Sequence, residues 1–285
     1  MEKTDNPMSK NETIVLNGTD PEGHTVEKIA PKAYLNCRQV KVMVLPETVR
    51  EIGDWAFAHM KRLETLYVSA REVQFGKKVF MGCESLVQII PGQAQVYEGI
   101  PYFLATSVHM YGERLLDLAL AGDKEGQWKW LLEYDEALLS YLKLPQEYGY
   151  EPVFIGWFDV EDVDDQRIRY IVNRKKNMIR MVFQRFAFSE NLTTEKEEAF
   201  RDFLLGRTDP EIPGLVAELF GEEDDTFSQT TEAVRIWQRI GGFAVIAARE
   251  LLAGMPQADP EVRAFLMEVI AGEASEDDFF EGLAL

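Results

Sequence analysis

The apolar positions between residues 29 and 91 recur at a constant spacing. Copies of one pattern begin at Ile29, Ile52 and Phe75. Each copy continues with a small residue, then an aromatic residue and further apolar positions. A fixed period of this length is typical of a solenoid, in which each repeat forms one coil of the chain. Because a single coil cannot bury its own apolar face, the pattern predicts stacked coils that need a cap at each end.

Two sets of apolar positions are predicted to fill the core of this stack. The first set lies on short strands and the second on the opposite side of each coil, where a small residue precedes an aromatic one. The first set is Val40, Met43, Leu45, Leu63, Leu66, Val68, Leu86 and Ile89, and the second is Ala33, Tyr34, Ala56, Phe57, Val79 and Phe80. Residues 13–16 predict a strand that covers the first coil, and the helical half of the chain is expected to cover the last.

The outward positions of the same strands form three columns. They are Lys41, Glu64 and Val87; Val42, Thr65 and Gln88; and Val44, Tyr67 and Ile90. The third column is apolar and aromatic, which is unusual for a surface that faces only water. One interpretation is a partner-binding face formed by Lys41, Val42, Val44, Thr65, Tyr67, Gln88 and Ile90. The other is that a further part of this chain, or a second copy of it, covers the column.

The repeated pattern is Ile-Gly-x-x-Ala-Phe, followed by a cysteine, a leucine and a short strand that ends in proline. It resembles the BspA-like leucine-rich repeats, and residues 52–68 match almost position for position. Ala30 stands where the pattern has glycine, and Phe75 replaces isoleucine. The resemblance covers somewhat under a third of the chain. It implies a short leucine-rich-repeat β-solenoid of three to four coils, with a surface of the kind that commonly serves protein recognition.

Beyond Pro91 this period ends, and apolar positions recur at the spacing of three and four that is typical of helices. Thr194 with Glu197, Asp209 with Pro210 and Asp259 with Pro260 predict helix N-termini, and Gly221, Gly241 and Gly272 predict helix ends. The prediction is an all-α helical bundle or short α-solenoid of about eight helices.

The fold class expected for the whole chain is therefore α+β multidomain. Its predicted parts are a flexible tail at residues 1–11, a BspA-like leucine-rich repeat domain at 12–92, a connector at 93–111 and a helical domain at 112–285.

Charge supports a division of the chain. The formal net charge is -19, yet residues 1–111 carry 12 basic and 13 acidic side chains, whereas residues 112–285 carry 18 and 36. This acidity argues against general binding to nucleic acids or anionic membranes.

The first twelve residues lack the apolar core of a secretory signal, and the apolar stretch 243–248 is too short to cross a bilayer. We therefore expect a cytoplasmic protein.

The segment 166–189 departs from this acidity, since it holds seven basic residues and no acidic one. One hypothesis is a regulatory binder of RNA or another polyanion, which would use Arg167, Arg174, Lys175, Lys176 and Arg180. The other is ion pairing within the chain, to the acidic residues at 159–165 and to Glu195, Glu197 and Glu198. We favour the second, because these acidic residues flank the segment closely. The acidic run 159–165 lacks the spacing of a calcium loop and predicts a helix N-terminus.

Motifs for catalysis are missing from the sequence, which has no phosphate-binding loop, nucleophile elbow or zinc-protease motif. His24, His59 and His109 do not stand at metal-ligand spacing from the cysteines. Cys37 and Cys83 occupy equivalent positions two coils apart, about 10 Å from each other, and a disulfide tolerates about 7 Å. We therefore expect buried, reduced cysteines, no metal and no cofactor. The function predicted is a non-enzymatic protein–protein interaction module or scaffold, whose oligomeric state the sequence leaves open.

Overall fold

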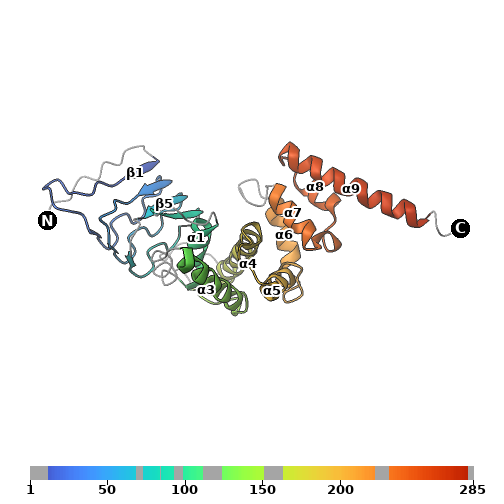
Figure 1. The fold of residues 1–285 in the computed structure, drawn as a ribbon, viewed down its shortest axis with the longest axis horizontal. Coiled ribbons are helices and arrows are strands. Elements are labelled where there is room, and N and C mark those ends of the chain that lie inside the picture. The colour runs from blue at the N-terminus through green and yellow to red at the C-terminus, as the bar shows by residue number, and fades with distance from the viewer. Residues whose placement is uncertain are drawn as a thin grey trace. The chain divides into compact units, whose positions relative to one another are not determined.

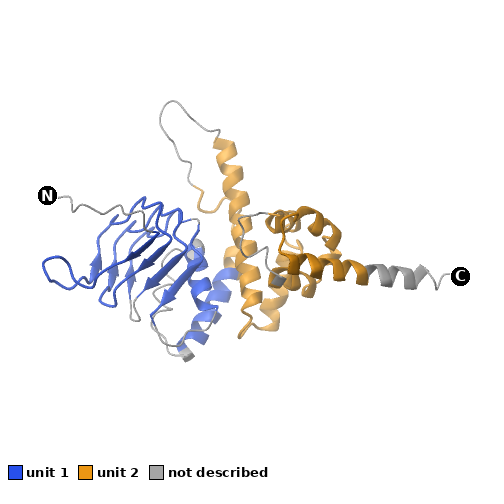
Figure 2. Ribbon diagram, turned by 90° about the horizontal axis from the view of Figure 1, so that it is seen from above, with its two compact units in different colours: residues 1–138 blue, residues 139–285 orange. Residues whose placement is uncertain are grey.

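The computed structural model describes residues 12–68, 73–83, 85–92, 99–111, 124–150, 163–221 and 231–281. The chain divides into two compact units, Met1–Leu138 and Leu139–Leu285 (Figure 2). The domain limits predicted at residues 92 and 111 stay predictions, because one compact unit can contain more than one domain.

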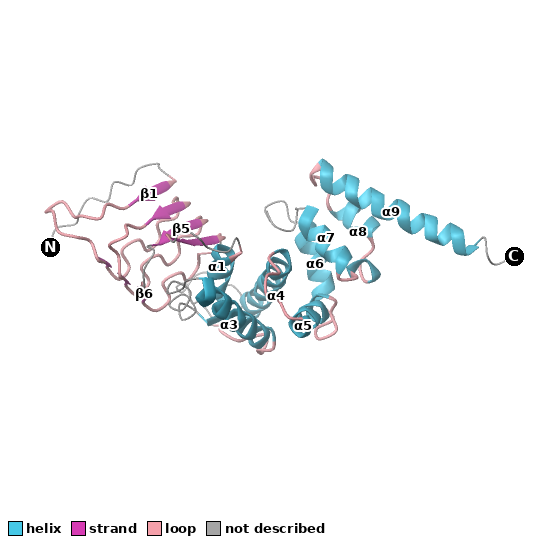
Figure 3. Cartoon of the chain, viewed as in Figure 1, coloured by secondary structure: helices cyan, strands magenta, loops and turns pink. Residues whose placement is uncertain are grey.

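Unit 1 contains two parallel β-sheets (Figures 1 and 3). The four-stranded sheet has the order β1 (Thr13–Val15), β3 (Val42–Val44), β5 (Thr65–Val68) and β7 (Gln88–Pro91). The three-stranded sheet has the order β2 (Lys28–Ile29), β4 (Glu51–Ile52) and β6 (Gln74–Phe75). Met43 pairs with Leu66 and Leu66 with Ile89, each one period later in the sequence. The predicted period is therefore the length of one coil, which we define as the chain from one strand of the larger sheet to the next.

The predicted apolar core of these coils is confirmed from β3 onward. Its buried members are Val40, Met43, Leu45, Ala56, Phe57, Leu63, Leu66, Val68, Val79, Phe80, Leu86 and Ile89. Aromatic rings stack from coil to coil, with centroids 5.9 Å apart between Tyr34 and Phe57 and 5.8 Å apart between Phe57 and Phe80. Each fully buried valine, leucine, isoleucine, methionine or phenylalanine side chain contributes about 1.5–3 kcal/mol to the free energy of folding. In the first coil, however, Ala33 is exposed and Tyr34 is only half-buried.

Each coil turns through two residues in the left-handed backbone region, four positions apart. These pairs are Lys32 and Asn36, Trp55 and His59, and Lys78 and Gly82. The turns of neighbouring coils are joined by backbone hydrogen bonds, such as Tyr34 N–H to the Ala56 carbonyl at 2.8 Å and Phe57 N–H to the Val79 carbonyl at 3.2 Å. These bonds satisfy backbone groups outside the sheets, so the turns tie the coils together as the strands do.

A helix covers the last strand of the larger sheet. Helix α1 (Ile100–Tyr111) packs against β7, and it lies within the segment 93–111 that the sequence analysis assigns to a connector. The phenol of Tyr134, in helix α3 (Lys124–Leu142), forms a hydrogen bond of 2.8 Å with Thr106 of α1, and its ring stacks on Phe103 at 4.9 Å. The sheet is therefore capped at its β7 end.

The rest of the described chain is mostly helical. Its helices are α4 (Val163–Ala187), α5 (Thr194–Leu204), α6 (Ile212–Gly221), α7 (Thr231–Arg239), α8 (Ala248–Gly254) and α9 (Pro260–Glu281), with the 3-10 helix η1 (Gly242–Ala244) after α7. Helix α4 packs against α5, α6 and α7, and α9 packs against α7 and α8. The rings of Phe183, Phe220 and Trp237 meet in this core.

The predicted helix ends are confirmed in part. The Asp259 carboxylate accepts a hydrogen bond from Glu261 N–H at 2.8 Å, and α9 begins at Pro260 as predicted. The N-cap of α5 is Thr193 rather than Thr194, because the Thr193 hydroxyl accepts from Lys196 N–H. The helix end predicted at Gly272 is wrong, since α9 continues to Glu281. In α4 the first turn is acidic, as predicted for the end of the run 159–165.

Among the described residues, no helix combines the length and the apolar character that crossing a membrane requires.

Candidate functional site

The outward side chains of the larger sheet form one continuous face, which we call the strand face. Six of the seven residues predicted to bind a partner lie on it, namely Val42, Val44, Thr65, Tyr67, Gln88 and Ile90, and the seventh, Lys41, directly precedes β3. Parallel pairing in register places Val44 beside Tyr67 and Tyr67 beside Ile90. Tyr67 is 40% exposed, whereas Val44 and Ile90 are half-buried. The predicted apolar column therefore exists, and its aromatic member is open to solvent.

Val15 extends this column, and the sequence analysis missed it. Val15 pairs with Val44 and is 66% exposed, the most open apolar side chain of the column. The separation of these two residues in the sequence is longer than one period, because the first coil carries a short hairpin closed by a bridge between Thr19 and Thr25. The sequence did predict a strand at residues 13–16. Aligning that strand with residues 42–45, with the hairpin treated as an insertion, would have placed Val15 beside Val44.

Charges at the border of the strand face are paired. The Lys41 ammonium lies 3.4 Å from the Glu12 carboxylate and 3.8 Å from that of Glu64, and Arg62 lies 2.9 Å from Glu12. The positive charge of Lys41 holds the pKa of Glu12 below its usual value. These exposed pairs contribute little to stability, but they balance one another's charge. The apolar column thus lies beside four charged residues, Glu12, Lys41, Arg62 and Glu64, whose charges sum to zero.

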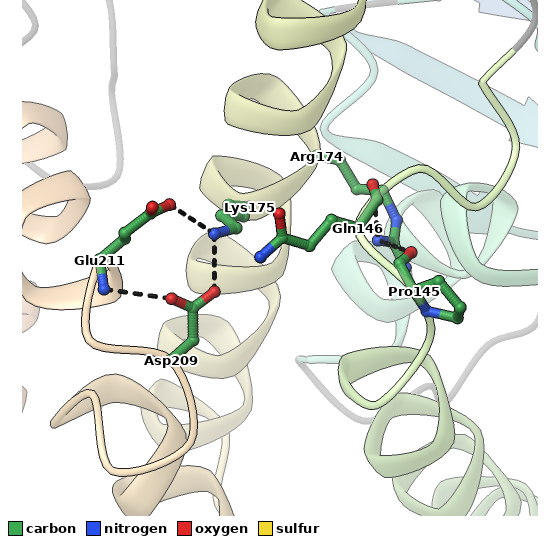
Figure 4. Close-up of polar contacts among 6 residues, drawn as sticks. All are labelled: Pro145, Gln146, Arg174, Lys175, Asp209 and Glu211. Atoms are coloured by element: carbon green, nitrogen blue, oxygen red, sulfur yellow. Dashed lines mark hydrogen bonds and ion pairs between the residues drawn. The ribbon is translucent and has the colours of Figure 1, made fainter.

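Arg174, from the alternative polyanion site, is turned into the protein (Figure 4). It is 5% exposed, and its guanidinium donates hydrogen bonds to the carbonyl oxygens of Pro145 at 2.9 Å and Gln146 at 3.3 Å. It also reaches the Tyr141 carbonyl, in the last turn of α3, and lies 4.7 Å from the centre of the Tyr141 ring. A cation beside the carbonyl end of a helix is stabilised by the helix dipole. Arg174 therefore fixes the end of α3 against α4.

Lys175 is buried as well, at 4% exposure (Figure 4). Its ammonium lies 2.7 Å from the carboxylates of both Asp209 and Glu211, in the segment that leads into α6. Burial alone would lower the pKa of Lys175, but the hydrogen bonds and charges of these carboxylates outweigh burial and raise it. Lys175 is thus a protonated link between α4 and the start of α6.

The remaining residues of the alternative site also have partners within the chain. Lys176 lies 3.0 Å from Glu218, Arg167 lies 3.1 Å from Glu147, and Arg180 donates to the side chain of Asn177. Arg167 also lies 3.3 Å from Asp164, which belongs to the acidic run predicted to pair with it. These contacts support pairing within the chain, although the partners Glu147, Asp209, Glu211 and Glu218 differ from those predicted in the sequence. Residues 159–162 lie outside the described part.

The cysteines are both free. Cys83 is buried and its thiol donates to the Phe57 carbonyl, whereas Cys37 is half-buried rather than buried as predicted. Burial raises the pKa of the Cys37 thiol, which disfavours the reactive thiolate. The structure also brings together Asp20, Glu22 and His24 in an exposed turn, where the backbone N–H of His24 donates to Asp20 at 2.8 Å and lowers the pKa of that carboxyl. Because the turn itself accounts for this arrangement, we assign no metal to it.

The two parallel sheets, the regular coil that joins them and the apolar column define a leucine-rich-repeat domain in the N-terminal part of the chain. Residues 20–102 match the family model described as BspA type leucine rich repeat region, in six copies. The predicted resemblance is confirmed for these repeats, and the chain that follows is mostly helical. No curated protein and no solved structure matches the chain.

Proposed function

We propose that the chain is a non-enzymatic protein–protein interaction module, in which a short leucine-rich-repeat β-solenoid presents the strand face to another protein. The single observation that carries this proposal is the column of Val15, Val44, Tyr67 and Ile90, which keeps an aromatic and an aliphatic side chain open to solvent. The repeat family supports it, since proteins with leucine-rich repeats generally bind other molecules through their surfaces.

Each part of the strand face has a role in this proposal. Tyr67 is the anchor, because tyrosine offers a large contact area with little loss of side-chain entropy and is enriched at binding hot spots. Val44 and Ile90 flank it as apolar contacts. The hydroxyl of Thr65 and the amide of Gln88 orient the partner through hydrogen bonds, together with Lys41.

The substitution Tyr67→Asp tests the proposal. It places a charge at the centre of the apolar column, so we expect affinity for the partner to fall by about 100-fold or more, as for the loss of a hot-spot residue. The partner is first captured from the soluble extract of the source cells, and its dissociation constant is then measured with the purified chains. Met267→Asp is the matched control, because Met267 is 54% exposed on α9 and the charge change is the same.

Thermal unfolding of the variants decides between a binding role and a packing role for Tyr67. The proposal requires Tyr67→Asp to retain the melting temperature of the native chain, within the small range typical of surface substitutions. If Tyr67→Asp unfolds the repeats, or if the partner binds it as tightly as it binds Met267→Asp, the strand face is not the binding site.

A further inference from the structure

The two ends of the larger sheet differ. At one end α1 packs against β7, whereas at the other end no strand in the described part of the chain pairs with β1 beyond its contact with β3. The difference extends into the core of the first coil. Five of its residues are half-buried or exposed although their equivalents in later coils are buried, namely Ile14, Leu16, Ala33, Tyr34 and Cys37, whereas Ile29 and Val40 of the same coil are buried.

The backbone of β1 has groups directed away from the sheet. The Glu12 carbonyl accepts from the Lys41 and Val42 N–H groups, and the Leu16 N–H donates to the Val44 carbonyl. Because the backbone groups of successive residues in a strand point to opposite edges, Thr13 and Val15 direct their N–H and C=O groups to the open edge. This edge contains no charged residue and no proline, two of the features that block pairing with another strand, and its length of three residues limits pairing to a short segment.

A complete further coil would stack here only with strain at the native spacing. In the second coil, a Cβ atom added to Gly53 would lie 2.6 Å from the Pro31 backbone nitrogen of the preceding coil. Ala30 occupies the equivalent position in the first coil and already carries a Cβ atom. That atom would meet the turn of a coil placed before it, so a single added strand suits the edge of β1 better than a complete repeat.

We propose that the open edge of β1 binds an extended peptide segment of a partner protein, which continues the four-stranded sheet by backbone hydrogen bonds. Such strand addition derives its affinity from main-chain bonds and its specificity from alternate side chains. One side chain of the added strand would lie beside Val15 on the strand face. The next side chain would point toward the core and cover Ile14, which is half-buried. This edge site adjoins the strand face at Val15, but its backbone hydrogen bonds do not depend on the role proposed for that face.

The test uses the intact chain and a labelled synthetic peptide with the sequence of residues 62–69, which contains β5. In the native sheet the Glu64 and Val68 carbonyls of this segment accept from the following coil, so the intervening Leu66 N–H points in the same direction. We therefore expect the peptide to bind beside β1, and binding to be lost when the nitrogen of its Leu66 is methylated. Methylation at Tyr67 is the matched control, because that nitrogen points away from β1 and its loss leaves binding intact.

A substitution in the chain provides the second arm. Val15→Pro removes one donor from the open edge and keeps the bonds of Glu12 and Leu16 to β3, so peptide affinity should fall by about fivefold to tenfold. Val15→Thr keeps the donor and should retain most of the affinity, and Tyr67→Asp should leave it unchanged even if the strand face binds its own partner.

Four outcomes would overturn the proposal. The first three are no binding of the unmethylated peptide at millimolar concentration, equal binding of the two methylated peptides, and a dimer in sedimentation experiments that Val15→Pro dissociates. The third result would assign the edge to a second copy of the chain. Peptide binding that appears only after residues 1–11 are deleted would assign the edge to the chain itself, and would equally exclude the proposal for the intact protein.

Discussion

At the scale of single residues, the glycine of the repeated pattern marks the closest approach between coils. A Cβ atom on Gly53 would lie 2.6 Å from the nitrogen and 2.8 Å from Cδ of Pro31, and one on Gly76 would lie 2.6 Å from the nitrogen of Asp54. Contacts this short involve backbone atoms, which cannot move aside as a flexible side chain can. The pattern therefore requires glycine where another coil precedes, and alanine is accommodated at Ala30, before which the described part of the chain has no coil.

The substitution Gly53→Ala should consequently destabilise the repeats. We expect a loss of about 1–3 kcal/mol in the free energy of unfolding, the usual cost of forcing an extra methyl group into a filled space. Gly18→Ala is the control, since its added Cβ would lie 3.6 Å from the nearest atom, an ordinary contact, and should change stability by less than about 0.5 kcal/mol. Urea unfolding followed by circular dichroism measures both. Equal stability of the two variants would show that the coils can separate locally without cost.

The sequence was sufficient to predict this part of the fold because the period is regular. Inward positions such as Met43, Leu66 and Ile89 could be aligned without a structure, and all three are fully buried. Val15 could not be aligned in this way, because the hairpin between Thr19 and Thr25 breaks the period. Nor could the sequence reveal that the pattern's glycine contacts the preceding coil, since the contact joins residues that lie far apart in the sequence.

At the scale of elements, the basic side chains of α4 hold neighbouring segments in place. Arg174 binds the end of α3 and Lys175 binds the start of α6. Asp209 has two functions at this point, because its carboxylate contacts Lys175 and also accepts from the Glu211 N–H at 3.1 Å. The sequence predicted pairing within the chain but selected acidic residues close in sequence. The actual partners depend on how helices pack, which local charge does not determine.

Removal of Lys175 should therefore weaken the helical unit. Lys175→Met leaves the Asp209 carboxylate without its cation, and we expect a loss of about 1–3 kcal/mol in the free energy of unfolding. Lys176→Met is the control, because Lys176 pairs with a mostly exposed carboxylate on Glu218 and such pairs contribute about 0–1 kcal/mol. Chemical denaturation of both variants measures the difference. A Lys175→Met chain as stable as the native one would show that the pair only offsets its own desolvation.

The stabilisation contributed by Lys175 should depend on pH in the alkaline range. The pKa of Lys175 is raised in the folded chain, so its stabilisation is complete below the unfolded value of about 10.4 and is lost as pH rises through the folded value. We expect the stability difference between the native chain and Lys175→Met to be constant near neutral pH and to shrink above a pH of about 10.5. A difference that shrank already at neutral pH would mean that another group titrates.

At the scale of the whole molecule, charge distribution separates the two functions considered from the sequence. The chain has a formal net charge of -19, and its one strongly basic segment directs Arg174 and Lys175 inward, where they are 5% and 4% exposed. Side chains in such positions cannot reach phosphate groups without breaking the contacts that hold α3 and α6. The strand face, in contrast, has paired charges at its border and an open apolar column, which suit a protein partner.

This distribution predicts that the chain does not bind RNA. Polyanion binding releases counterions and is therefore strongest at low salt, so the most sensitive test is fluorescence anisotropy of labelled single-stranded RNA at low ionic strength. We expect no binding there, because repulsion by the acidic surface acts over about 10 Å or more under these conditions. Substituting Arg174, Lys175 and Lys176 together should lower the free energy of unfolding, and RNA binding should remain absent. Salt-dependent binding that this change abolished would instead show that α4 exposes its basic residues in solution, and the polyanion hypothesis would replace the protein-binding one.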